Sequence, residues 1–190
     1  DVDIPVIRSK QVSLGLSFSK KGWLLSADSY YKYVKGITTQ SQGFQNQYEF
    51  VKTSGNYKAL GVDFIMRKQI KDFTTWLSYS YLNSDYEFEM LPEQLFPMNL
   101  DINHTITLGA VYSLEHLKLS AGLNWHSGRP TTQPIVGNEI IDNTINFEAS
   151  NSRTLQDYLR VDVSALYDFK LSKTTKANLG VSVWNVLNRT

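Results

Sequence analysis

Apolar and polar residues alternate with a period of two along several segments of the chain. Gln11–Ser19 shows this best, because Val12, Leu14 and Leu16 alternate there with small or polar residues, and Leu117–Trp125 repeats the pattern. Successive side chains of a β-strand point to opposite faces. Each segment therefore predicts a strand with one apolar face and one polar face.

Eight such segments occur, and the connections between them alternate in length. The predicted strands are Gln11–Ser19, Trp23–Lys35, Tyr48–Gln69, Phe73–Asp85, Thr105–Ser113, Leu117–Ser127, Leu159–Lys170 and Lys176–Val186. The short connections are residues 20–22, 70–72, 114–116 and 172–175, and the long ones are residues 36–47, 86–104 and 128–158. Short turns predict antiparallel neighbours, hence an all-β meander. Tight turns at one end and long loops at the other are typical of an outer-membrane β-barrel.

A soluble antiparallel sandwich with one buried face is the alternative fold. Its connections would not alternate so regularly in length, and its strands would usually be shorter. The two folds predict opposite surroundings for the apolar rows. In a barrel, side chains such as Leu14, Leu119 and Val181 point outward, whereas in a sandwich they form a closed core. The pattern favours the barrel.

Composition narrows the function classes. The net charge is +1 with no basic patch, which argues against nucleic-acid binding, and cysteine is absent. Nowhere do 18 apolar residues follow one another, so no transmembrane helix is expected. Aromatic residues make up 13% of the chain and gather near predicted strand ends. Such placement suits the two aromatic girdles of a membrane barrel.

Five short motifs occur in order over nearly the whole chain. They are Gly61–Asp63, Asn99–Thr105, Ser127–Thr131, Tyr158–Ser164 and Val183–Arg189. Each is weak alone, but their order and spacing resemble the C-terminal part of the β-barrel of TonB-dependent receptors. The family often has Glu at the position of Asp63.

The resemblance implies a fold larger than this chain. A receptor of this family has a barrel of 22 strands with a plugged lumen, so residues 1–190 are expected to be one partial barrel domain. The plug domain and the last strand of the barrel are expected to lie outside it. A complete eight-stranded barrel is less suitable, because with short turns in the periplasm both chain ends would lie outside the cell.

Candidate binding residues follow from strand phase and from the long loops. We expect ligand contacts at the outer rim from Trp125, His126 and Arg129, although a purely structural role for His126 is the alternative. The polar face is predicted to face the lumen or the plug, since charges facing lipid are costly. Its charged members are Asp28, Lys32, Asp63, Arg67, Arg160 and Asp162.

No catalytic or metal site is predicted, and no cofactor. Ser127 and His126 are neighbours in a strand and point to opposite faces, and no G-x-S-x-G or H-E-x-x-H motif occurs. Acidic residues between Asp85 and Glu93 could hold a cation, but they lack the pattern of a calcium loop and are better explained as a solvated loop.

The predicted function is that of the barrel wall of a receptor in the bacterial outer membrane. The resemblance implies active uptake of a scarce ligand such as a siderophore, haem, cobalamin or glycan. It implies as partners the surrounding lipid, the plug domain of the same protein, TonB acting through the plug, and the ligand. A passive porin and a barrel-embedded enzyme are the alternatives.

Overall fold

The computed structural model of the chain describes residues 6–39 and 53–189, and within these ranges the regular elements are all strands. The eight long strands are β1 (Arg8–Lys20), β2 (Trp23–Thr38), β3 (Ser54–Ile70), β4 (Phe73–Glu87), β6 (His104–Ser113), β7 (Leu117–His126), β12 (Tyr158–Lys170) and β13 (Lys176–Val183). Short strands within the long connections are β5 (Leu95–Pro97), β8 (Pro130–Thr131), β9 (Ile140–Ile141), β10 (Thr144–Ile145) and β11 (Arg153–Thr154). In the described ranges there is no helix with the length and apolarity that membrane crossing requires.

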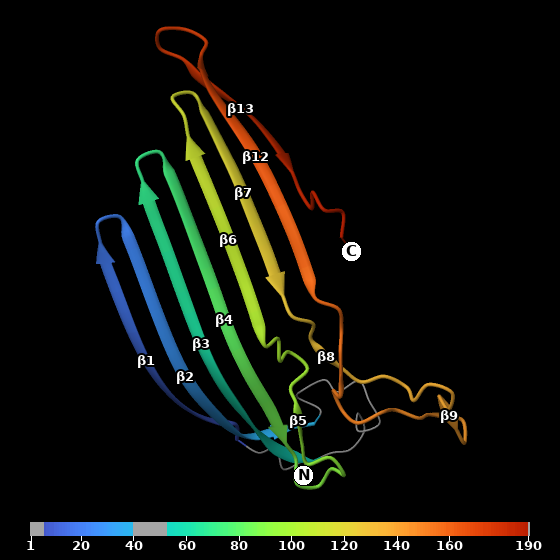
Figure 1. Cartoon of the computed structure of the whole chain (residues 1–190). Coiled ribbons are helices and arrows are strands. Elements are labelled where there is room, and N and C mark those ends of the chain that lie inside the picture. Colours follow the sequence, from blue (N-terminus) through green and yellow to red (C-terminus); the bar gives the residue numbers. More distant parts are fainter. Residues whose placement is uncertain (1–5, 40–52, 190) are drawn as a thin grey trace.

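The long strands form one antiparallel sheet in the order β1-β2-β3-β4-β6-β7-β12-β13, and β5 pairs with the outer part of β4. Figure 1 shows the short hairpins gathered at one end of this curved sheet and the long connections at the other. The strand at each end of the order pairs on one side only, so the sheet is open. The predicted all-β meander is confirmed, and its open form is that of a partial barrel.

The first two hairpin turns are tighter than predicted. Lys20 pairs directly with Trp23, which leaves a two-residue turn at Lys21 and Gly22, with φ of 48° and 76°. Positive φ at both central residues is the type I′ turn, whose twist matches that of the flanking strands. Ile70 likewise belongs to its strand and pairs with Phe73.

Some predicted strand ends need correction. The strand predicted to reach Val186 ends at Val183, because Asn185 adopts a φ of 52° and turns the chain out of the extended conformation. The strand predicted to end at Ser127 ends one residue earlier. The third strand begins at Ser54, and the predicted start at Tyr48 lies outside the described residues.

The strand register places the predicted apolar side chains together on one side of the sheet, called here the apolar face. One row across it consists of Leu16, Ala27, Phe64, Tyr79, Ile106, Trp125 and Leu159. Leu14 and Val181 are 71% and 62% exposed, so these rows do not form a closed core. Hydroxyls on this face bond to the backbone, as when Thr75 Oγ1 donates to the Gly109 carbonyl at 2.9 Å. A hydroxyl that is hydrogen-bonded within the protein needs no water partner, as a surface without access to water requires.

The buried apolar residues of the described chain gather instead at the loop end of β2–β4. This rim core consists of Val34, Ile37, Tyr86, Phe88, Leu91 and Phe96. The Phe88 and Phe96 rings stack at 6.3 Å between centroids. β3 has 17 residues, whereas crossing a bilayer takes about 9–11. β2, β3 and β4, with 16, 17 and 15 residues, are all longer than such a crossing, and the rim core lies at their loop ends.

Candidate functional site

The opposite side of the sheet, called here the polar face, carries the second set of alternating residues. One row across it consists of Gly15, Asp28, Asp63, Ser80, Thr105, His126 and Tyr158. All six charged residues predicted to face the lumen lie in rows of this face: Asp28, Lys32, Asp63, Arg67, Arg160 and Asp162. That this face encloses a lumen stays a prediction.

Arg160 and Asp162 form an ion pair on the polar face that also anchors the segment after β13. Arg160 Nη2 lies 2.9 Å from Asp162 Oδ2, and the backbone N–H of Asn185 donates to Asp162 Oδ1 at 2.8 Å. The Arg160 guanidinium lies 5.7 Å from the centre of the Trp184 ring. Two of the motifs noted in the sequence, at 158–164 and 183–189, therefore bind each other.

A pocket of about 500 Å³ opens on the polar face of β1–β4, next to the rim core. We call it the wall pocket, and its lining residues are Gln11, Tyr30, Lys32, Tyr57, Ala59, Asp63, Leu82, Ser84, Met98 and Leu100. Tyr57 and Met98 also pack against the rim core. Of the pocket's residues, only Lys32 and Asp63 were predicted from the sequence, because strand phase marks charged residues more clearly than tyrosines.

Residues 98–103 form a shelf over the wall pocket between β5 and β6. Asp101, which is 4% exposed, accepts hydrogen bonds from Ser84 N at 2.7 Å and Ser84 Oγ at 2.9 Å. Asn103 Nδ2 donates to the Leu82 carbonyl and to Asp101 Oδ2, both at 2.9 Å. The motif at Asn99–Thr105 thus ties the shelf to β4, a role that its sequence alone did not reveal.

The three rim residues predicted to bind ligand do not meet in one site. Trp125 pairs with Ile106 and Leu159 on the apolar face, whereas His126 lies on the polar face. The His126 ring stacks on Tyr158 at 5.1 Å, and its Nδ1–H donates to the Ser127 carbonyl at 2.8 Å. Arg129 is exposed at the start of the next loop. Their role in binding stays a prediction.

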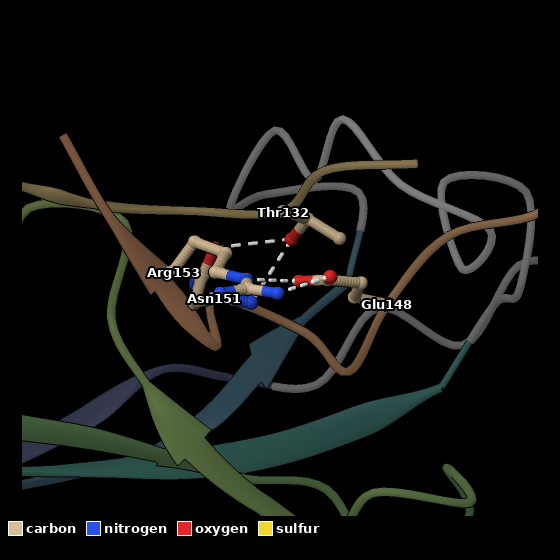
Figure 2. A network of polar contacts seen from close by, with 4 residues as sticks. All are labelled: Thr132, Glu148, Asn151 and Arg153. Atoms are coloured by element: carbon tan, nitrogen blue, oxygen red, sulfur yellow. Dashed lines mark hydrogen bonds and ion pairs between the residues drawn. The ribbon is translucent and has the colours of Figure 1, made fainter. Parts of the chain in front are cut away.

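The connection between β7 and β12 folds into a long two-stranded arm that projects from the rim (Figure 1). Figure 2 shows the polar network near its base, where Asn151 N donates to Thr132 Oγ1 at 2.9 Å. In the same view, Arg153 Nη2 donates to Glu148 Oε1 at 2.6 Å. Hydrogen bonding to this guanidinium lowers the pKa of Glu148 below its ordinary value.

Two hydrogen bonds join this arm to the loop between β4 and β6. The Ser150 backbone N–H donates to Glu93 Oε2 at 2.5 Å, and Asn151 Nδ2 donates to the Pro97 carbonyl at 2.7 Å. Nearby, Glu87 pairs with Lys58 at 2.9 Å. Glu93 in the loop and Glu87 at the end of β4 thus hold structure together, and in the described part of the chain no group of three or more His, Asp and Glu side chains could hold a metal ion.

Comparison with known proteins identifies the architecture. The profile of the family described as "TonB dependent receptor-like, beta-barrel" matches residues 6–188. The crystal structure of the ferric citrate transporter FecA in its unliganded form superposes with a TM-score of 0.71 at 13% sequence identity. The match covers 95% of this chain and 26% of that transporter, so the chain spans about a quarter of its length. No curated protein sequence is significantly similar to the chain.

Proposed function

Because the chain belongs to the TonB-dependent receptor-like β-barrel family, we propose that it serves active uptake of a scarce ligand across the bacterial outer membrane. In this proposal the sheet is part of the wall of a barrel whose lumen is closed by a plug domain. TonB, acting through that plug, supplies the energy. The observation that carries the proposal is the exposed apolar face that runs across the eight long strands.

The chemistry of the two faces supports this arrangement. An exposed apolar surface of this extent is unfavourable in water and favourable against lipid tails. The polar face carries charges of both signs, which would be costly in lipid and are acceptable against water or a plug surface. The wall between them is one strand thick, which suits a barrel that separates lipid from an aqueous lumen.

The rim supports capture of the ligand from outside the cell. The arm and the loop between β4 and β6 are both at the loop end, and hydrogen bonds link them. Loops held on a rigid scaffold are the usual carriers of binding residues. We include His126 and Arg129 among the candidate ligand contacts, and Trp125 with them as a rim residue that would meet the membrane interface.

Uptake by cells that carry the full-length gene tests the proposal. Candidate ligands labelled with a radioisotope, including iron chelates, haem, cobalamin and oligosaccharides, are supplied to cells with and without a functional TonB. We expect saturable uptake of one ligand class that is lost without TonB. Antibodies against the arm should label intact cells, and the protein should be extracted only by detergent.

Two results would contradict the proposal. Solute flux that does not saturate and is unchanged without TonB would indicate a passive porin. Recovery of the full-length protein in the soluble fraction would exclude the membrane barrel. A parallel strain that expresses only the vector provides the background for both measurements.

A further inference from the structure

The wall pocket combines features of a ligand site with a preformed shape. Its volume of about 500 Å³ falls within the range of small-molecule sites, which is roughly 300–1,000 Å³. Side chains from β1 to β4 and from the shelf line it. Because the rim core packs on Tyr57 and Met98, one side of the pocket is held by a buried apolar cluster.

Two tyrosines provide flat surfaces in the pocket. The Tyr30 ring lies against the backbone of Gly61, where a Cβ atom would come within 2.2 Å of the phenol carbon Cζ. Only glycine leaves room for the ring to lie so close to the wall. The Tyr57 ring is set opposite the Lys32 ammonium, whose Nζ lies 5.9 Å from the ring centre. The pocket therefore offers aromatic surface that is already positioned.

The polar groups of the pocket balance in charge. Lys32 supplies one positive charge and Asp63 one negative charge, and Gln11 adds an uncharged donor and acceptor. Asp28 pairs with Asp63 in the strand register, which adds a second carboxylate beside the pocket. With Asp28 counted, the pocket and its surroundings carry one net negative charge, which disfavours a polyanion such as a carboxylate chelate of iron. The lining holds no histidine or cysteine for the iron of haem, and its other possible iron ligands are Tyr30, Tyr57 and Met98, so haemin is kept as a competing ligand in the test.

Flat aromatic surface with mixed hydrogen-bonding groups and no net positive charge suits an uncharged polyhydroxyl ligand. The C–H faces of sugar rings can stack on tyrosine, and their hydroxyls both donate and accept hydrogen bonds. We propose that the wall pocket binds a segment of an uncharged oligosaccharide on its way through the barrel. This inference rests on the proposed function, in which the polar face lines the lumen.

Calorimetry on the full-length receptor in detergent tests the assignment. The probes are linear uncharged hexasaccharides of glucose, mannose and xylose, with ferric citrate and haemin as the competing ligand classes. We expect one hexasaccharide to bind, and Tyr57→Ala to raise its Kd roughly 30-fold, as expected for an aromatic hot spot. Tyr57→Phe keeps the ring and removes only the phenol hydroxyl. It should change the Kd less than about threefold, since the net contribution of one hydrogen bond is modest.

Two further variants separate binding from folding. Gln11 is exposed on β1, so Gln11→Trp should fill the pocket mouth and weaken binding without disturbing the rim core. Tyr33→Ala is the matched control, because Tyr33 lies on the apolar face of β2 and not on the face that carries the pocket. There the Lys35 Nζ lies 5.5 Å from the centre of the Tyr33 ring. This control variant should leave the Kd unchanged.

The outcomes distinguish this inference from the proposed function. Binding of ferric citrate or haemin, with no hexasaccharide bound, would overturn the inference and leave TonB-dependent uptake intact. Binding of a hexasaccharide that neither Tyr57→Ala nor Gln11→Trp weakens would also overturn it. Flux that is independent of TonB would instead overturn the proposed function.

Discussion

Leu16 and Phe88 are both large apolar side chains, yet Leu16 is 74% exposed on the apolar face and Phe88 is fully buried in the rim core. The sheet away from the rim is one layer thick, so its apolar side chains point outward, toward lipid in the proposed barrel. At the rim, where strands and loops meet water, apolar side chains turn toward one another. Large apolar side chains thus stabilise the two regions in different surroundings: lipid around the proposed membrane wall, and other apolar side chains in the rim core.

The difference also concerns which contacts hold each region. In the one-layer sheet, which we propose spans the membrane and call here the membrane band, strands are joined by continuous backbone ladders between neighbours along the chain. At the rim, side chains also join separate loops, as when Glu93 bonds to Ser150. We therefore expect substitutions to act locally at the rim and globally in the band.

Removing the centre of the rim core should have the largest effect. Phe88→Ala would leave a cavity beside Phe96 and Tyr86, and deleting a buried phenylalanine typically costs about 3–5 kcal/mol. Hydrogen exchange on the full-length receptor should show faster exchange at the amides of Phe88 and Leu91, which bond within the loop. The membrane-spanning ladders should stay protected.

Phe18→Ala is the matched control for that substitution, because Phe18 is 51% exposed on the apolar face. It should leave exchange at the rim unchanged. Equal loosening of the rim by both substitutions would contradict the separation of the two regions.

A charge on the apolar face should produce the next largest effect. Leu16→Arg would face lipid near the middle of β1, where an arginine costs roughly 2–4 kcal/mol. Urea unfolding of the full-length receptor in lipid vesicles should report this loss. Ser17→Arg places the same charge one residue later on the polar face, and we expect it to cost less than about 1 kcal/mol. If Ser17→Arg proved the more damaging, the assignment of the two faces would be reversed.

The smallest effect should come from the ion pair in the arm. Hydrogen bonding to Arg153 lowers the pKa of Glu148 from its ordinary value near 4.5, so the pair stabilises the folded arm above that pH. The stabilisation should be lost as the pH falls through the lowered value, when the carboxylate is protonated. An acid-stable protease should then cut residues 128–158 faster.

Arg153→Ala tests the cause of that pH dependence. Without the guanidinium, cleavage of the arm should already be fast at neutral pH and should vary little on acidification. An unchanged pH profile in this variant would show that other groups control the arm. Because the pair is on the surface, we expect a modest change in rate.

Strand phase and the positions of the short turns were readable from the sequence because they are local. The alternation around Leu14 and Leu119 identified the apolar face, and Gly22 marked a hairpin turn. The six charged residues predicted for the polar face lie on it for the same reason, since period-two alternation assigns every residue of a strand at once.

The binding features were less predictable. Trp125, His126 and Arg129 were grouped because all three lie near the outer rim, but Trp125 and His126 are neighbours in a strand and lie on opposite faces. Tyr30 and Tyr57 lie on neighbouring strands but were not predicted as binding residues. Neither segment shows that Gly61 makes room for the Tyr30 ring or that the rim core supports the Tyr57 ring.

The sequence by itself determined the class of fold, the family, the two faces of the wall and the end at which the long loops gather. Each of these depends on short-range periodicity or on motifs of a few residues. The shelf tied by Asp101, the rim core around Phe88, the wall pocket and the link between the arm and the neighbouring loop were decided only by the tertiary structure. These features join residues separated by long stretches of chain, and such contacts leave no periodic trace in the segments that supply them.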